Sequence, residues 1–256
     1  MARRGRAFIG TSGWSYDHWT GRFYPPLLPT SNRLPFYAQH FQTVEINATF
    51  YRLPKPATVV HWAEETPGRF RFAAKASRFI THMKKLKDPD TSLSPFFRAI
   101  AGLAEKCGPI LFQLPPHWRV NPDRLTDFLQ VLPAGHRYAF EFRDPSWYDT
   151  EVFLALADHA AALCIHDLAG SPSPVETTAD FVYLRLHGPA GPYRGKYGNA
   201  ALRKWADRLA RWNAEGRDVY CYFNNDEKAY AVTDALTLKD LVATAASRSQ
   251  QKKGGN

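Results

Sequence analysis

Cysteine is scarce in this sequence: three residues, Cys107, Cys164 and Cys221, are spread over 256 positions with no Cys-x-x-Cys pair. An odd number of widely separated cysteines argues against a disulfide framework and against a cysteine-rich zinc site. No run approaches the ~20 apolar residues that span a bilayer. The first residues, Met-Ala-Arg-Arg-Gly-Arg, also lack the apolar stretch of a secretion signal. We therefore expect a cytoplasmic protein with no membrane partner.

Signs of disorder and of division into domains are also missing. Hydrophobic residues make up 45% and charged residues 22% of the chain, which is ordinary for a globular protein. The formal net charge is +9, but six of the basic residues lie at the two ends. They are Arg3, Arg4, Arg6, Arg248, Lys252 and Lys253. We predict a basic, solvated N-terminal end over 1–6, one domain over 7–247, and a polar, disordered tail over 248–256.

Eight short runs, rich in β-branched and aromatic residues and bounded by Gly, Pro or polar clusters, predict buried strands. They are Phe8–Thr11, Thr43–Asn47, Arg69–Lys75, Pro109–Gln113, Tyr138–Phe142, Leu163–His166, Phe181–Leu186 and Val219–Phe223. Helical patterns separate most of them, including one capped by Asn121 or Asp123, one that begins near Asn199, and one from Asp226 towards Val242. This alternation predicts a single α/β TIM-type (β/α)8 barrel. A doubly wound open sheet is the alternative, but the 10–13 turn leads into no convincing helix.

Polar residues gather where the predicted strands end, which is where barrel enzymes carry their chemistry. Because strand side chains alternate between two faces, residues two apart point the same way. The candidate catalytic residues at these ends are Glu45, Asn47, Lys75, Glu141 and His187. The candidate binding residues at these ends are Gln113, Arg143, Arg185, Asn224, Asn225 and Asp226. An alternative is that these groups only pair with one another, as a self-satisfied buried network.

Three loops add further candidates. The loop after the first strand contains Ser12, Trp14 and Tyr16, whose rings could stack on a sugar or a base. The loop after the third strand has five basic residues and no acid between 75 and 87. The glycine-rich loop after the seventh strand leads into a helix and resembles an anion site of barrels. Its candidate binding residues are Tyr193, Arg194, Lys196 and Tyr197.

Five segments resemble the YecE-like family, which is catalogued as domain of unknown function 72. They are Ile9-Gly10-Thr11-Ser12-Gly13-Trp14-Ser15-Tyr16, Val44-Glu45-Ile46-Asn47-Ala48-Thr49-Phe50-Tyr51, Phe140-Glu141-Phe142-Arg143-Asp144-Pro145-Ser146-Trp147, Tyr183-Leu184-Arg185-Leu186-His187-Gly188 and Tyr222-Phe223-Asn224-Asn225-Asp226. The resemblance runs from about Phe8 to about Val242. It departs from the family pattern at 229–231, where a glycine-containing stretch is usual. The resemblance implies a TIM-type barrel but supplies no reaction.

Three functions remain open from the sequence. The first is an enzyme acting on an anionic substrate, such as a sugar phosphate, nucleotide or nucleic acid, with no cofactor. In it Glu45 and Glu141 are acid and base, His187 is an alternative proton carrier, and Lys75 has a lowered pKa. The second is a metal-dependent hydrolase or sugar-isomerase-like enzyme. Its divalent ion would take ligands from Glu45, Glu141, His166, Asp167, His187 and Asp226. The third is a non-enzymatic protein that binds the nucleic-acid backbone through a basic barrel mouth.

Overall fold

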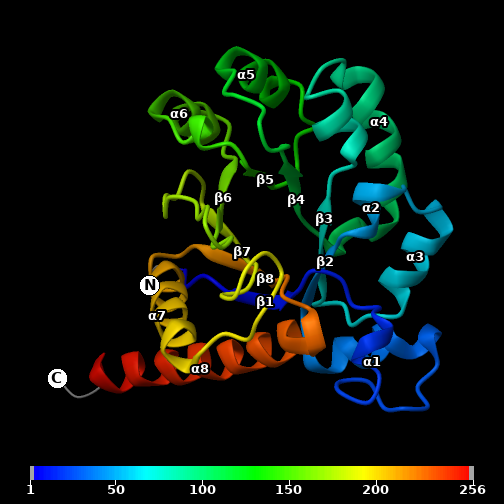
Figure 1. Ribbon diagram of the computed structural model, residues 1–256, viewed down its shortest axis with the longest axis vertical. Coiled ribbons are helices and arrows are strands. Elements are labelled where there is room, and N and C mark those ends of the chain that lie inside the picture. Colours follow the sequence, from blue (N-terminus) through cyan, green and yellow to red (C-terminus); the bar gives the residue numbers. More distant parts are fainter. Residues whose placement is uncertain (1–2, 254–256) are drawn as a thin grey trace.

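A nearly closed ring of eight parallel strands forms the centre of the protein (Figure 1). The computed structural model describes residues 3–253, with side chains as far as residue 245. The strands are β1 Ala7–Thr11, β2 Thr43–Ile46, β3 Arg71–Lys75, β4 Cys107–Gln113, β5 Tyr138–Glu141, β6 Ala162–His166, β7 Phe181–Leu186 and β8 Asp218–Phe223. All eight predicted strands are confirmed, each within two residues of its predicted ends. The single TIM-type barrel is therefore confirmed.

The barrel closes between β1 and β2 by a short and unusual contact. Seven neighbouring strand pairs are joined by regular parallel ladders, whereas β1 and β2 share an isolated bridge between Ser12 and Glu45. Above it, the Gly13 N–H donates to the Glu45 carbonyl at 2.8 Å. Below it, the hydroxyl of Tyr37 accepts from the Thr11 N–H at 2.9 Å and donates to the Thr43 carbonyl at 3.1 Å. A tyrosine side chain thus replaces a backbone hydrogen bond at the seam.

Gly10 lies at this seam, and we expect Gly10→Ala to destabilise the protein by about 1–3 kcal/mol through overpacking. A Cβ at position 10 would overlap the Thr43 carbonyl oxygen of the neighbouring strand. Gly68→Ala is the matched control, because a Cβ there meets no heavy atom within 4 Å. Urea unfolding of both variants measures the difference. Equal stability of the two variants would contradict this account of how the barrel closes.

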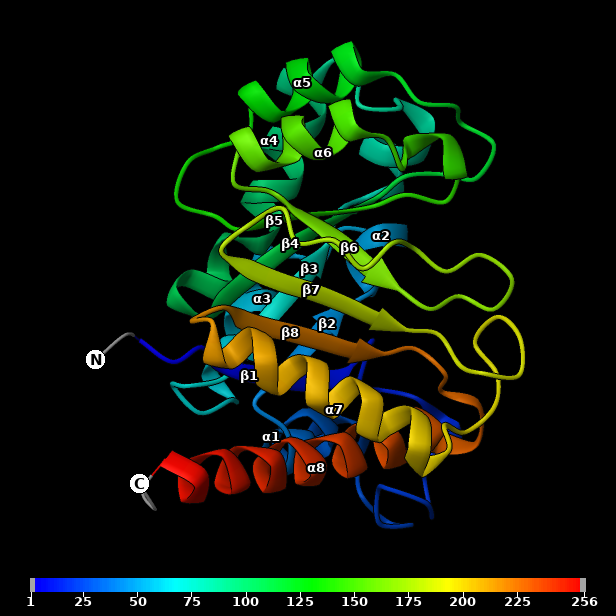
Figure 2. The same ribbon diagram turned by 90° about the vertical axis from the view of Figure 1, so that its left-hand side faces the viewer.

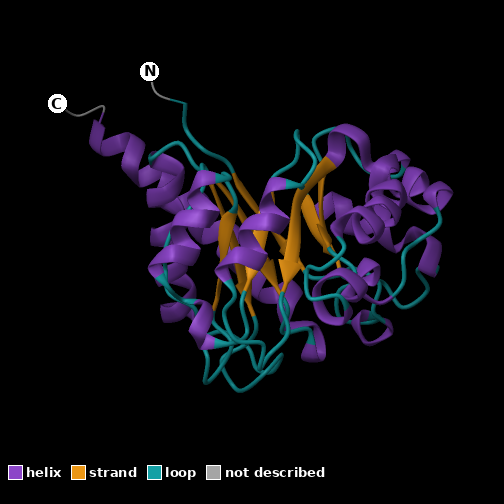
Figure 3. Cartoon of the chain, turned by 90° about the horizontal axis from the view of Figure 1, so that it is seen from above, coloured by secondary structure: helices purple, strands orange, loops and turns teal. Residues whose placement is uncertain are grey.

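Helices cover the outside of the barrel (Figure 3). They are α1 Arg33–His40, α2 Ala48–Tyr51, α3 Pro56–Glu64, α4 Pro89–Ile100, α5 Pro122–Gln130, α6 Thr150–Asp158, α7 Asn199–Ala214 and α8 Tyr230–Lys253. Short helical turns are η1 Asp17–Trp19, η2 Thr30–Asn32, η3 Phe79–Met83, η4 Ala101–Lys106, η5 Pro145–Trp147 and η6 Glu227–Ala229. The predicted cap at Asn121 is confirmed by its bond from the Arg124 N–H. The barrel departs from strict alternation between β6 and β7, where residues 167–180 contain no helix.

Aromatic side chains fill the lower part of the barrel interior. Phe8 and Tyr220 stack with ring centroids 4.7 Å apart, and Tyr183 and Tyr222 meet in the layer above at 5.4 Å. All four side chains are buried, as are the alanines that face them from the other strands. Because rings fill this part of the barrel, polar side chains of the inward faces meet at its two ends. Asp218 pairs with Arg137 at the amino ends of the strands, and a larger group meets in the layer at the carboxyl ends.

Figure 2 shows β6, β7 and β8 pointing towards the longest loops, which surround that end of the barrel. We call this end the barrel mouth. The described chain begins at the opposite end, where Arg3 forms an ion pair with Asp218 at 3.0 Å and the Arg6 N–H donates to the same carboxylate. The Arg3 side chain is 69% exposed, so it is solvated and also has a carboxylate partner at the start of β8. The prediction of a basic, solvated end over 1–6 stays a prediction.

The other end of the chain continues the last helix. α8 begins at Tyr230, after η6, rather than at Asp226, and it continues to Lys253, into the 248–256 segment for which we predict a disordered tail. Residues 243–253 contain no Gly or Pro, so nothing in their local sequence ends the helix. Residues 254–256 lie outside the described part of the chain, and the prediction for them stays a prediction.

Candidate functional site

Arg185 is the centre of a buried polar network at the barrel mouth. Its guanidinium donates to Glu45 Oε1 at 2.9 Å and to Glu141 Oε2 at 2.7 Å, so it joins β2 to β5 from β7. It is 1% exposed, and both carboxylates are fully buried. Ser12 Oγ lies 3.3 Å from the same guanidinium, contacts Glu45 Oε1, and accepts from Asn47 Nδ2 at 2.7 Å. The residues that the alternation along the strands places on the inward faces, Glu45, Glu141 and Arg185, therefore lie in contact with one another.

A second arginine continues the network upwards, towards solvent. Arg143 Nε donates to Glu141 Oε1, and its Nη2 lies 3.4 Å from His187 Nε2. A guanidinium can only donate, so this contact is a hydrogen bond when His187 Nε2 is the ring nitrogen that carries no proton. His187 Nδ1 in turn lies 3.4 Å from the Asn224 amide nitrogen. Glu141 is thus held from two sides, and the neutral imidazole is held over it.

The charges around Glu141 and His187 decide their protonation. Burial alone would raise the pKa of Glu141, but Arg143 and Arg185 outweigh it and hold that pKa well below the usual range. Burial, and then the charge of Arg185, lower the pKa of His187 well below its usual value. At neutral pH the site therefore contains an ionised Glu141 and an uncharged His187. The arrangement favours Glu141 as a fixed partner for two arginines and argues against its service as a proton donor.

Lys75 differs from its neighbours because its amine has no carboxylate within ion-pair distance among the side chains that the structure describes. It ends β3 on the inward face, is 8% exposed, and holds Nζ 4.1 Å from the centroid of the Phe50 ring. Burial lowers the pKa of Lys75 to about 8, and the positive charge of Arg185 adds to this effect. An amine with that pKa can take up and release protons near neutral pH, which is the requirement for general acid–base catalysis.

Aromatic side chains line a cleft of about 350 Å³ beside the mouth, which we call the aromatic cleft. Its walls include Trp14 and Tyr16 from the first loop, together with Tyr51 of α2 and Trp62 of α3. That Trp14 and Tyr16 bind a ligand stays a prediction. Tyr16 donates to the Ser12 carbonyl at 2.7 Å, which fixes its ring across the backbone at Gly13. Gly13 has φ +87°, so glycine suits both the backbone and the close approach of the ring.

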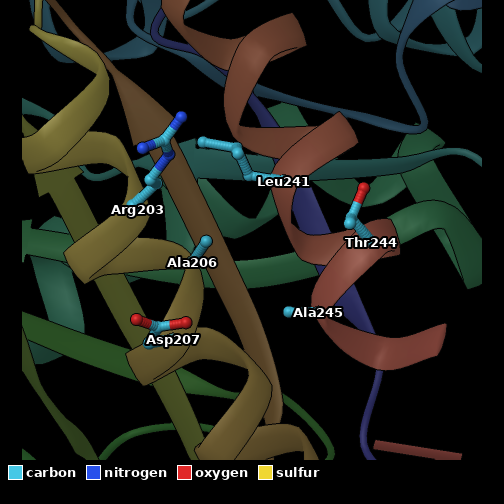
Figure 4. Close-up of a pocket in the computed structure, with 6 residues that line it drawn as sticks. All are labelled: Arg203, Ala206, Asp207, Leu241, Thr244 and Ala245. Carbon is cyan, nitrogen blue, oxygen red and sulfur yellow. The ribbon is translucent and has the colours of Figure 1, made fainter. Parts of the chain in front are cut away.

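A larger groove of about 430 Å³ lies between α7 and α8 (Figure 4). It is lined by Arg203, Ala206, Asp207, Leu241, Thr244 and Ala245. None of the residues of the mouth network contributes to it, and α7 and α8 pack on the outer surface of the barrel. We therefore place the candidate site at the mouth, where buried ionisable groups converge, rather than in the larger hollow.

The glycine-rich loop after β7 uses many of its own N–H groups. The N–H groups of Gly188, Ala190, Arg194, Gly195 and Tyr197 all donate to acceptors within the protein. They are therefore unavailable to cradle an anion, which weakens the case for a phosphate site built from this backbone. Binding by the exposed side chains of this loop, Arg194 and Lys196, stays a prediction.

The other predicted binding residues divide between the mouth and the surrounding loops. Gln113 ends β4 on the inward face, in register with Glu141, and Tyr193 lies with its ring centroid 5.3 Å from that of His187. Three others have partners outside the network at the mouth. Tyr197 donates to Asp167, Asn225 donates to Asp234 at 2.8 Å, and Asp226 lies 3.7 Å from His18. These three hold the loops above β6, β7 and β8 in place.

Sequence reasoning missed several members of the site. Tyr183 donates to Glu45 Oε2 at 2.7 Å, and Cys164 Sγ lies 3.8 Å from Glu141 Oε2. Tyr183 shares a face with Arg185, so strict alternation along β7 is a signal that could have found it. Phe50, whose ring faces the Lys75 amine, lies in the short helix α2, so alternation along a strand does not reveal it. Tyr51 and Trp62 lie on helices that the sequence pattern alone does not place beside the mouth.

The residues proposed as metal ligands do not assemble into a cluster. Within the part of the chain that the structure describes, no three His, Cys, Asp or Glu side chains are arranged to hold a metal ion. Glu141 and His187 approach to 3.9 Å, but Asp167 accepts hydrogen bonds from Tyr197 and from the His187 backbone N–H instead.

Among the described residues, no helix is both long and apolar enough to cross a membrane.

Comparisons with known proteins agree with the barrel. Residues 8–255 match the model of a family described as "Protein of unknown function DUF72". The UPF0759 protein YunF of Bacillus subtilis is 25% identical over 268 residues, which cover 92% of this chain and 94% of that protein. The UPF0759 protein YecE of Escherichia coli K12 is 36% identical over 143 residues, which cover 55% of this chain and 50% of that protein.

Among solved structures, a DUF72 family protein of Thermotoga maritima has a TM-score of 0.85 at 28% identity, covering 93% of this chain and 99% of that one. A D-psicose 3-epimerase of Clostridium cellulolyticum has a TM-score of 0.58 at 11% identity, covering 93% of this chain and 99% of that one. At that identity the second likeness concerns the fold alone.

Proposed function

The chain belongs to the DUF72 family of proteins of unknown function, and from the geometry of its barrel mouth we propose that it is an enzyme that transfers a proton on an anionic small molecule. The observation on which the proposal rests is the setting of Lys75. Its amine is buried on the inward face of β3, lies over the Phe50 ring, and has no carboxylate partner in the described part of the chain. A lysine is rarely buried without such a partner unless the site needs the amine.

The charge balance of the mouth supports an anionic substrate. The two negative charges of Glu45 and Glu141 are balanced by the two positive charges of Arg185 and Arg143. A protonated Lys75 therefore gives this group a net charge of about +1. Arg143 is 9% exposed on its side chain and lies at the solvent side of the network. A carboxylate or phosphate that enters the mouth therefore meets two cations in a region of low dielectric.

The roles of the residues follow from their protonation. Lys75 in its neutral form accepts a proton from the substrate and returns it, so no atom is gained or lost over the cycle. His187, uncharged and 3.4 Å from Arg143, donates one ring hydrogen bond to the substrate or exchanges a proton with it. Glu45 and Glu141 keep the two arginines in position. Because only the neutral amine of Lys75 accepts a proton, the rate of proton removal rises as pH increases through about 8.

The test is exchange of substrate carbon-bound hydrogen in D2O. We expect at least one member of a panel of sugar phosphates and phosphorylated ketones to incorporate deuterium next to its carbonyl, detected by proton NMR. Lys75→Met is expected to lower the rate by about 10²–10⁴-fold, the range for loss of a general acid–base group. Lys204→Met, on the exposed face of α7, is the control and keeps the wild-type rate. Exchange that persists in Lys75→Met would overturn the assignment of Lys75.

A further inference from the structure

The aromatic cleft is open although it is built from large rings. Trp14 and Trp62 meet edge to face, with centroids 5.1 Å apart and planes at 87°, so their faces form a corner. The Tyr51 side chain beside them is 73% exposed. Exposed aromatic surface of this kind, gathered in a concave site, marks a place where a ligand is bound. A corner of two rings offers one face for stacking and one edge for a second contact with a flat ligand.

The aromatic cleft is continuous with the mouth network. Asn47 lines the cleft and donates to Ser12 Oγ at 2.7 Å, and Ser12 lies 3.3 Å from the Arg185 guanidinium. Tyr16 forms the wall that the two regions share, since its ring faces the cleft and its hydroxyl bonds the Ser12 carbonyl. On its other side, Tyr51 of the cleft wall has its ring centroid 5.0 Å from that of Phe50, and Phe50 lies 4.1 Å from Lys75 Nζ, so the cleft also borders the cation that we propose for substrate binding.

We infer that the aromatic cleft binds a heteroaromatic ring that belongs to the same anionic substrate, so that the substrate class is a nucleotide or a compound built like one. This inference rests on the proposed function, because it takes the anionic end of the substrate to lie at Arg143 and Lys75. Flat rings with polar edges stack on tryptophan and tyrosine and also satisfy a nearby amide such as that of Asn47. An aliphatic ligand would use neither property.

The test measures equilibrium binding of single nucleotides by calorimetry at low salt. Adenosine, guanosine, cytidine and uridine 5′-monophosphates are compared with ribose 5-phosphate, which has the anion without the ring. We expect at least one nucleotide to bind at least ten times more tightly than ribose 5-phosphate. Trp62→Ala and Tyr51→Ser are each expected to reduce this advantage by about 5- to 100-fold, the range for loss of one stacked base, while ribose 5-phosphate binding stays unchanged.

Trp62 packs against the core, so Trp62→Ala can also impair folding. Tyr51 is largely exposed, so Tyr51→Ser removes a ring of the cleft with little effect on the fold. Leu154→Ser, at a 59% exposed position of α6, is the matched control and leaves all affinities unchanged. Equal affinity for every nucleotide and for ribose 5-phosphate, no binding at all, or no effect of either cleft variant would overturn the inference.

The proposed function fails in a different way. Arg143→Ala is expected to weaken the nucleotide and ribose 5-phosphate alike, because both place their phosphate at the mouth. If nucleosides without phosphate bind the aromatic cleft as well as nucleotides do, and Arg143→Ala changes neither affinity, then the anionic site is refuted. In that case the aromatic cleft still binds a ring, but the ring does not belong to an anionic substrate held at Arg143.

Discussion

Replacing Lys75 with methionine is expected to stabilise the folded protein by up to about 3 kcal/mol at pH 7. The pKa of Lys75 falls from 10.5 to about 8 on folding, and each unit corresponds to about 1.4 kcal/mol. Below pH 8 the lysine is charged in both states, so its burial opposes folding by the full amount. Methionine fills a similar volume with no charge to bury. Urea unfolding of the two proteins at pH 7 measures the difference.

The sign of the pH dependence separates this effect from ordinary repacking. Between about pH 8 and 10.5 the unfolded state binds more protons at Lys75 than the folded state does, so the stability of the wild type rises relative to the variant. The advantage of Lys75→Met is therefore expected to shrink across that interval and to vanish above it. Lys204→Met, at an exposed position, is expected to change stability little at any pH. A destabilised Lys75→Met at pH 7 would mean that Lys75 supports the fold.

Replacing Arg185 with methionine is expected to lower the free energy of unfolding by about 3–5 kcal/mol, the cost of breaking a buried ion pair from one side. Glu45 and Glu141 are fully buried and receive hydrogen bonds from Arg185 at 2.9 and 2.7 Å. Arg143 still compensates Glu141 in the variant, but Glu45 loses its cation. Chemical denaturation at pH 7 gives the value, and a loss below about 1 kcal/mol would contradict the network.

Neutralising Glu45 together with Arg185 provides the control. Arg185→Met combined with Glu45→Gln removes the carboxylate that loses its cation and keeps the ion pair of Glu141 with Arg143, and it is expected to recover much of the lost stability. Acid has a related effect in the wild type. Because the pKa of Glu141 is held below its ordinary value of 4.5, its contribution is present above that pH and is lost as pH falls towards the lowered pKa. The double variant keeps Glu141 and Arg143, so it is expected to keep this part of the acid sensitivity.

The sequence predicts the barrel and the inward faces because both depend on local patterns. Alternation within a strand places Glu141 with Arg143 and Arg185 with His187, and the structure keeps each pair on one face. The ends of parallel strands then meet at one end of the barrel, which brings these faces together. The prediction succeeds wherever a period of two residues and the strand order are sufficient.

Other features depend on contacts between segments far apart in the sequence. No local pattern shows that the Tyr37 hydroxyl joins β1 to β2, or that Trp62 of α3 reaches Trp14. The pairing of Arg3 with Asp218 joins residues 215 positions apart. Which cation lacks a carboxylate partner is also a question of geometry. The sequence places three cations, Lys75, Arg143 and Arg185, at the ends of strands without distinguishing them. The contacts in the structure show that both arginines pair with glutamates.

The most direct test of the account is the titration of the Lys75 amine itself. Protein labelled with ¹³C at the lysine ε-carbon gives one signal per lysine as pH is raised, and the signal missing from Lys75→Met identifies the residue. We predict a midpoint of about 8, which marks a buried amine ready to exchange protons at the barrel mouth. A midpoint near 10.4, the value of an ordinary lysine, would contradict the claim that Lys75 is the proton carrier of this site.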